Sequence, residues 1–148
     1  MNPPSTLKHR TSIHLVAAAV VAISAAAWHP GAGAQAQAPA AQSSAERGVT
    51  VKVTPKAFGP AGEWEFAVVL DTHSAELNDD FAKAAVLVVD GNELRPVSWT
   101  GAAAGGHHRE GVLKFPAPRQ APEAVELRIQ RAGETAARVF RWDGAALR

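Results

Sequence analysis

Four polar side chains with the chemistry of metal ligands lie at the ends of two predicted strands. They are Asp71, His73, His108 and Glu110. Imidazole nitrogens combined with carboxylate oxygens suit Zn²⁺ or Cu²⁺. Their spacing matches no standard zinc motif, and the alternative is an exposed polar rim in which the two acids pair with the histidines and with Arg109. A histidine that responds to pH or binds a ligand is a third interpretation.

Strand periodicity decides which of the adjacent histidines, His107 or His108, joins this set. Side chains alternate between the two faces of a strand. Apolar residues at the even positions of 64–70 face the core, so His73 falls on the solvent side. In the strand predicted for 109–115 the inward positions are odd, so His108 also points outward. If the two strands are antiparallel neighbours, His73 lies closer to His108 than to His107. We therefore expect His107 and Arg109 to surround the set rather than to bind directly.

Two other kinds of site have less support. Ser74 follows His73 with Asp71 close by, but sequence neighbours on a strand cannot aim at one reacting atom, and the Gly-x-Ser-x-Gly motif is absent. We therefore predict that the protein is not an enzyme. The acids Asp79 and Asp80 lack the alternating spacing and turn glycine of a calcium loop, so a solvated loop or the first turn of a helix is favoured.

The elements that must position these residues are indicated by alternation and by turn signals. We expect seven strands, at residues 49–54, 63–71, 84–90, 93–99, 109–115, 125–129 and 136–142. This spacing is typical of an all-β sandwich of the immunoglobulin-like class. A tight hairpin at Asp90-Gly91 keeps the third and fourth strands in one sheet, which favours the fibronectin type III arrangement. The first, second and fifth strands then form one sheet, and the other four form the second.

This arrangement brings three loops to one end of the sandwich, at residues 72–83, 100–108 and 131–135. Because antiparallel neighbours run in opposite directions, the end of one strand lies beside the start of the next. Trp64, Trp99 and Trp142 all fall at inward positions, so we expect core packing rather than a sugar-binding platform.

The first third of the chain has the composition of an export signal followed by a spacer. Two basic residues precede an apolar run at 13–27, and the small-residue triplet Ala32-Gly33-Ala34 follows it. We predict a signal peptide at 1–34, a flexible Ala/Gln/Pro/Ser spacer at 35–47 and a β-sandwich domain at 48–148. Retention of the apolar run as an anchor is the alternative. Either way, the domain is expected in the periplasm or outside the cell.

Composition excludes several functional classes. The chain has no cysteine, so disulfides, thiolate nucleophiles and thiolate metal ligands are excluded. Removing residues 1–34 takes Lys8 and Arg10 from the 15 basic residues, leaving 13 against 14 acids. This balance favours neither nucleic acid nor an anionic membrane as a partner. After signal removal we expect no membrane insertion.

One pattern within the predicted domain is similar to a known group of proteins. It consists of Thr72-His73-Ser74, then Trp99, then Gly-Gly-His-His-Arg-x-Gly-x-Leu-x-Phe-Pro over residues 105–116. The pattern resembles a family of exported bacterial β-sandwich domains of unknown function. The resemblance implies the fold and the domain boundaries, and it implies no activity.

Two functional hypotheses follow. The first is an exported, non-enzymatic binding module that presents the three loops to a protein or to a small ligand, without a cofactor. The alternative is a periplasmic metal-binding domain that holds Zn²⁺ or Cu²⁺ with His73 and His108. The metal content of protein purified without a His tag distinguishes them.

Overall fold

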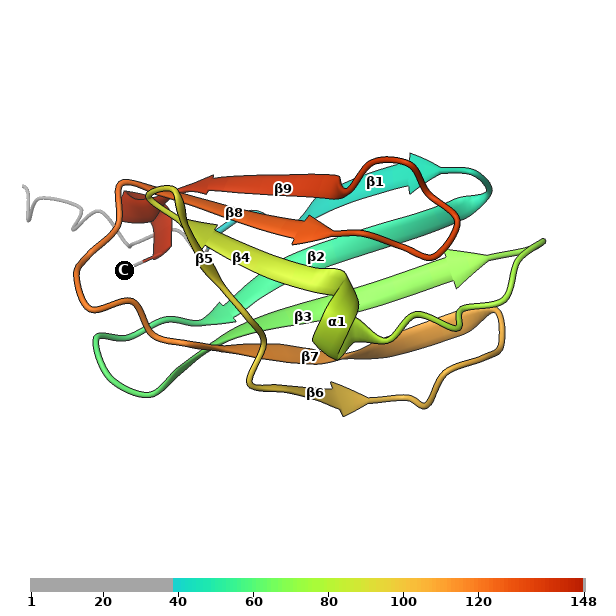
Figure 1. Ribbon diagram of the computed structural model, residues 1–148, viewed down its shortest axis with the longest axis horizontal. Helices are drawn as coiled ribbons and strands as arrows, with labels where there is room; N and C mark the ends of the chain where they lie inside the picture. The colour runs from blue at the N-terminus through green and yellow to red at the C-terminus, as the bar shows by residue number, and fades with distance from the viewer. Residues whose placement is uncertain (1–38, 148) are drawn as a thin grey trace, which may run out of the picture. The chain divides into compact units, whose positions relative to one another are not determined.

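The alternating segments of the sequence form nine strands in two antiparallel sheets (Figure 1). This computed structural model describes residues 39–147, so the predicted signal peptide and the start of the spacer lie outside the described residues. The strands are β1 (Gln42–Glu46), β2 (Val49–Ala57), β3 (Glu63–Thr72), β4 (Ala85–Val89), β5 (Asn92–Leu94), β6 (Ser98–Gly101), β7 (His108–Pro116), β8 (Ala124–Ile129) and β9 (Arg138–Asp143). Two short helices, α1 (Phe81–Ala84) and η1 (Gly144–Leu147), complete the described part. None of its helices is long and apolar enough to cross a membrane.

The order of the strands confirms the predicted β-sandwich. One sheet has the order β1-β2-β3-β7-β6 and the other the order β5-β4-β8-β9. The predicted antiparallel pairing of β3 with β7 is present, with Asp71 opposite His108. The core lies between the sheets, where inward side chains of β3 meet those of β7 and β9. For example, the Phe66 ring lies 5.9 Å from Phe115 and 5.6 Å from Trp142.

The predicted fourth strand, residues 93–99, is wrong as a single element. Its first part is β5, which pairs with β4 as expected, but its last part begins β6, which pairs with β7 in the other sheet. Pro96 lies between the two parts and has no N–H to continue a ladder, so the chain leaves one sheet and crosses to the other. As a result Val97 is 57% exposed, and Trp99, expected at an inward position, is only half-buried.

The spacer predicted for residues 35–47 is also partly wrong, because residues 42–46 form the edge strand β1. No residue of this strand is fully buried, so apolar packing does not order it. Instead, the buried Arg138 of β9 donates hydrogen bonds to the carbonyl oxygens of Ser44 (3.0 Å) and Glu46 (2.8 Å). The side-chain amide of Gln42 also accepts from the backbone N–H of Arg141 at 3.1 Å. These contacts hold β1 against β9 as well as against β2.

A chain that starts at Gly48 is therefore expected to be less stable than one that starts at Pro39. Deleting β1 removes two acceptors of Arg138, and an unsatisfied buried donor costs about 1–3 kcal/mol. Urea unfolding of the two truncated chains measures the difference. Equal free energies of unfolding would show that β1 adds nothing and that the domain begins at Gly48, as the composition indicates.

Candidate functional site

Three loops meet at one end of the sandwich, as the strand pattern predicts (Figure 1). We call residues 73–80, 102–107 and 130–137 together the loop end. The first loop contacts both of the others. The backbone N–H of Gly105 donates to the Leu77 carbonyl oxygen at 2.9 Å, and the N–H of Ala132 donates to Asp79 Oδ1 at 3.2 Å.

Beside the loop end, three of the four predicted ligand residues lie together on the outer face of the five-stranded sheet. His108 Nδ1 lies 2.6 Å from Asp71 Oδ1, and His108 Nε2 lies 3.8 Å from Glu110 Oε2. All three side chains are more than half exposed. The hydrogen bond to Asp71, together with the negative charges of Asp71 and Glu110, raises the pKa of His108 above its ordinary value of 6.5, against a smaller opposing effect of desolvation.

The predicted metal set is not formed as a site. β3 ends at Thr72, whose side-chain oxygen accepts hydrogen bonds from the N–H groups of Ser74 (3.2 Å) and Ala75 (3.1 Å). The chain therefore turns at His73, and the strand alternation that predicted its direction does not continue to that residue. Within residues 39–147, no three His, Asp or Glu side chains are arranged to hold a metal ion. The chemistry of Asp71, His108 and Glu110 is that of an exposed ion-pair cluster.

The two residues expected to surround the set have other contacts. The ring of His107 lies on the first loop, with Nδ1 3.2 Å from the Ala75 carbonyl oxygen. Arg109, expected to pair with acids of the rim, is instead buried, with 4% of its surface exposed. Neighbouring side chains on a strand point to opposite faces, so Arg109 points inward because His108 points outward.

Arg109 joins two of the three loops from beneath. Its guanidinium donates to the carbonyl oxygens of Leu77 (3.2 Å) and Asp79 (2.6 Å) in the first loop, and its Nε donates to that of Ala102 (3.1 Å) in the second. The same group lies over the rings of Phe81 and Trp99, 4.9 and 5.3 Å from their centroids. Cation–π contact and charge-assisted hydrogen bonds thus stabilise a cation beside the core.

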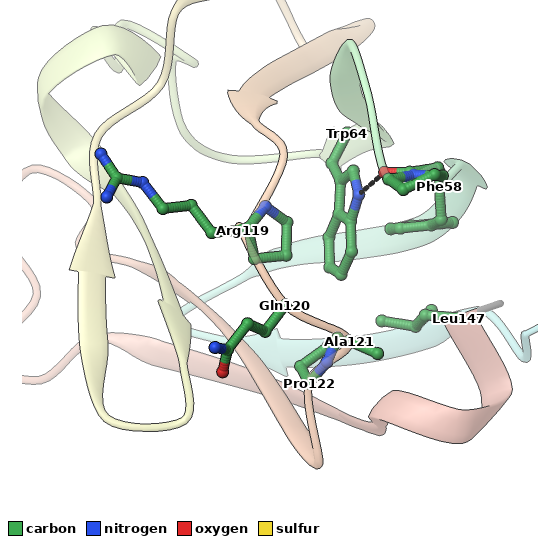
Figure 2. A pocket seen from close by; sticks show the side chains of 10 residues that line it. Phe58, Trp64, Arg119, Gln120, Ala121, Pro122 and Leu147 are labelled. Atoms are coloured by element: carbon green, nitrogen blue, oxygen red, sulfur yellow. Dashed lines mark hydrogen bonds between the residues drawn. The ribbon is translucent and has the colours of Figure 1, made fainter.

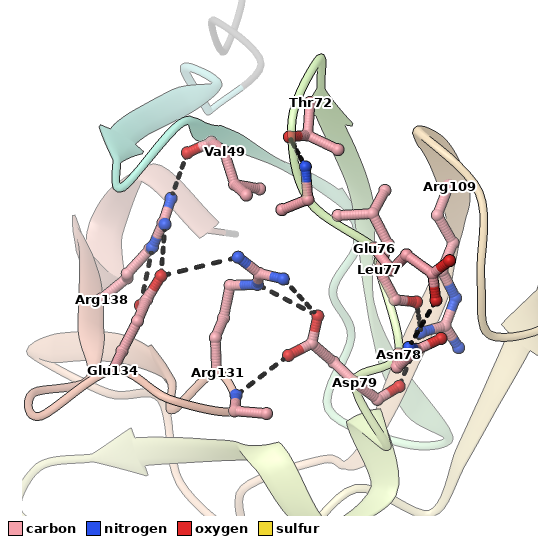
Figure 3. Close-up of polar contacts among 12 residues, drawn as sticks. Val49, Thr72, Glu76, Leu77, Asn78, Asp79, Arg109, Arg131, Glu134 and Arg138 are labelled. Carbon is pink, nitrogen blue, oxygen red and sulfur yellow. Dashed lines mark hydrogen bonds and ion pairs between the residues drawn. The ribbon is translucent and has the colours of Figure 1, made fainter.

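Asp79 joins the first loop to the third (Figure 3). Its Oδ2 accepts hydrogen bonds from Nε (3.0 Å) and Nη2 (2.9 Å) of Arg131, while its Oδ1 accepts from the backbone of Ala132. Both charged side chains are buried, with 1% of Asp79 and 7% of Arg131 exposed. The expectation of a solvated acidic loop is therefore wrong for Asp79. It holds for Asp80, an exposed residue that caps α1.

Glu134 and Arg138 continue this chain of buried charges to the start of β2. Glu134 Oε1 lies 3.6 Å from Arg131 Nη1, and Glu134 Oε2 accepts from Arg138 Nε at 3.0 Å. Arg138 in turn donates to the carbonyl oxygen of Val49 at 2.8 Å. Every buried side-chain nitrogen or oxygen in the described part of the chain has a hydrogen-bond partner. We call Asp79, Arg131, Glu134 and Arg138 the buried ionic network.

The buried ionic network is not among the predicted sites, although strand-like alternation marks Asp79, Arg131 and Arg138. Leu77 and Phe81 are buried with Asp79 midway between them, while the residues on either side of Asp79 are exposed. Arg131 follows the inward positions of β8 in the same way, and Arg138 precedes those of β9. The sequence signal for such a network is a set of charged residues that continue the inward positions of several strands at the same end of the sandwich.

Comparisons with known proteins give little beyond this geometry. No family model matches the chain, and no curated protein matches it. Among solved structures, the chain is similar to MPT63, a secreted protein from Mycobacterium tuberculosis, with a TM-score of 0.44 and 11% sequence identity. That match covers 70% of this chain and 92% of MPT63.

Asp71→Asn is expected to lower the pKa of His108 toward 6.5, because it removes the main group that stabilises the imidazolium ion. Glu110→Gln, which removes the more distant acid, should lower it less. NMR titration of the His108 ring measures both. A pKa that does not change in Asp71→Asn would contradict the ion pair.

The raised pKa of His108 also determines how the stability of the fold depends on pH. A raised pKa in the folded state means that the pair stabilises the fold below pH 6.5, and that this stabilisation is lost as pH rises through the raised pKa of His108.

Proposed function

We propose that this protein is an exported, non-enzymatic binding module whose binding surface is the loop end. The observation that carries the proposal is the set of buried charges beneath the three loops. The buried ionic network joins the first loop to the third, and Arg109 joins the first to the second. Buried ion pairs are often no better for stability than apolar residues of similar size, because the charges lose their hydration. Here they join segments up to 52 positions apart in the chain, so their main effect is a defined loop geometry. Loops ordered before binding avoid the entropy cost of ordering on contact.

The outer surface of the loop end is polar. His73, Glu76, Asn78 and His107 are all exposed, and the Asn78 amide donates to the Glu76 carboxylate at 3.0 Å. Hydrogen-bond donors and acceptors on rigidly held loops suit a polar surface of a partner protein or a polar small ligand. Binding sites on many sandwich domains lie on loops that a rigid scaffold positions.

Export and the lack of catalysis remain parts of this proposal. Export is supported by the order of basic, apolar and small residues in positions 1–34. The similarity to exported bacterial β-sandwich domains, through the Gly-Gly-His-His-Arg pattern, agrees with it. The alternative of a Zn²⁺ or Cu²⁺ domain is less favoured, because no three His, Asp or Glu side chains within residues 39–147 are arranged to hold a metal ion.

Site-specific photo-crosslinking in the producing cell tests the proposal. A photoreactive residue at position 78, in the loop end, should give a discrete adduct whose partner mass spectrometry identifies. The matched control carries the same group at Lys56, an exposed position toward the other end of β2, and should not give that adduct. The proposal fails if position 78 gives no adduct, or if both positions give the same products.

A further inference from the structure

A pocket of ≈ 260 Å³ (Figure 2) lies at the end of the sandwich opposite the loop end, where the turn between β2 and β3 lies (Figure 1). Three segments that are distant in sequence build it: the turn between β2 and β3, the connection between β7 and β8, and η1. Its apolar lining includes Phe58, Trp64, Pro118, Pro122 and Leu147.

The walls of this pocket are fixed by hydrogen bonds outside it. The N–H of Ala117 donates to the Gly62 carbonyl oxygen at 3.3 Å, which joins the first two segments. The N–H of Gly144 donates to the Glu123 carbonyl oxygen at 2.8 Å, which joins the second to η1. Prolines in the connection restrict its backbone further. A pocket built in this way exists before any ligand arrives, as most small-molecule sites do.

The aromatic wall is carbon surface from the partly exposed Phe58 and from the edge of Trp64, whose surface is 3% exposed. Phe58 and Trp64 pack edge to face, with ring centroids 4.9 Å apart. The indole N–H of Trp64 already donates to the Gly59 carbonyl oxygen at 3.0 Å, so this donor is occupied. A flat apolar group can therefore pack against this wall.

The charge at the mouth of the pocket is positive. Among residues 39–147, Arg119 is the one charged residue in the lining, and no acid of this range lines the pocket. Its side chain is exposed and forms no hydrogen bond or ion pair with any other residue of the described range. Figure 2 shows it leaving the same connection as Gln120 and extending away from Trp64. Because this side chain is exposed, rotation about its χ angles would bring the guanidinium to the rim, where it would meet a ligand whose apolar body is in the pocket.

We propose that this pocket binds a small molecule with a flat apolar body and one carboxylate group. The body packs against Phe58 and the exposed edge of Trp64, and the carboxylate pairs with the guanidinium of Arg119 once that side chain turns toward the rim. The volume lies just below the roughly 300–1,000 Å³ of sites for drug-sized ligands, so the ligand is small, with a body of about two fused rings. This site is separate from the loop end and does not depend on its function.

Titration of the exported protein, as recovered from the producing cell, with 2-naphthoate tests the site. The reporter is the NMR signal of the Trp64 indole N–H, which should shift and saturate. The neutral 2-naphthamide has the same rings without the charge, and it should bind about three- to fivefold more weakly, the upper part of the range for one exposed ion pair.

Three variants make the test specific. Arg119→Gln should weaken naphthoate binding about three- to fivefold and leave the amide unchanged. Lys56→Gln removes a positive charge outside the lining and should change neither. Ala121→Trp, at an exposed lining position, should fill the pocket and abolish both, with the rest of the spectrum confirming the fold.

Four results would overturn the proposal. They are an unsaturable Trp64 shift, equal effects of Arg119→Gln and Lys56→Gln, unchanged binding in Ala121→Trp, and a Trp64 signal that depends on protein concentration without the probe. The last would assign the pocket to a second copy of the chain.

Discussion

Replacing Asp79 by alanine is expected to lower the free energy of unfolding by about 3–5 kcal/mol, the usual cost of breaking a buried ion pair from one side. The guanidinium of Arg131, with 7% of its side chain exposed, would lose its two hydrogen bonds to Asp79. The N–H of Ala132 would lose its acceptor as well. Urea unfolding followed by tryptophan fluorescence measures the change.

The neighbouring acid provides the control. Asp80 is exposed, accepts from the N–H of Ala82 at the start of α1 and pairs with Lys83 on the surface. Its replacement by alanine should cost about 1 kcal/mol, the usual value for a helix cap. If the two variants lose the same stability, Asp79 is a solvated loop residue and the buried ionic network does not contribute as described.

Trp64→Ala is the second large effect, with an expected loss of about 3–5 kcal/mol. This side chain is 3% exposed, packs against Phe58 and lies at the start of the strand that crosses the middle of its sheet. Its removal leaves a cavity that the fixed proline-rich connection cannot fill by collapse. The same unfolding assay measures the loss.

Val97→Ala serves as the comparison for Trp64. Val97 is a large apolar residue with 57% of its surface exposed, so its truncation should change stability by no more than about 0.5 kcal/mol. A neutral Trp64→Ala would show that the inward assignment of even positions in β3 is wrong.

The face of each long strand is predictable from sequence because side-chain alternation is a local property. It places Trp64 in the core and Asp71 on the outside of β3, and it turns His108 outward on β7. Together with the order of the strands, it predicts the contact between Asp71 and His108. His73 is exposed as predicted, but it lies beyond the end of the strand, in a turn formed by the Thr72 side chain, so alternation does not set its direction.

Elements that depend on distant partners are not predictable in this way. β1 contains no buried residue, and its order comes from Arg138, 94 positions after Ser44. The crossing of the chain between sheets at Pro96 depends on whether β7 has a free edge, which is a property of the whole fold.

The buried arginines show most clearly that some burial depends on partners distant in sequence. Alternation assigns Arg109, Arg131 and Arg138 to the inside, whereas residue type assigns them to the surface. The conflict is resolved only by partners in the loops, such as Asp79 and the carbonyl oxygen of Leu77. Loop conformation cannot be derived from local alternation. The position of the loop end is therefore predictable from sequence, whereas the contacts of the buried charges beneath it are not.

Amide hydrogen exchange tests most directly whether the buried ionic network, together with Arg109, holds the three loops as one surface. The reporters are Gly105, which donates to Leu77, and Ala132, which donates to Asp79. Ala117, which donates to Gly62 at the other end of the sandwich, corrects for global unfolding.

In the wild-type protein, Gly105 and Ala132 should exchange as slowly as Ala117. In Asp79→Asn, both should exchange about tenfold faster relative to Ala117, equivalent to about 1.4 kcal/mol of local opening. Fast exchange at Gly105 in the wild type, or acceleration of Ala132 alone in the variant, would show that the loops move independently and would contradict a preformed binding surface.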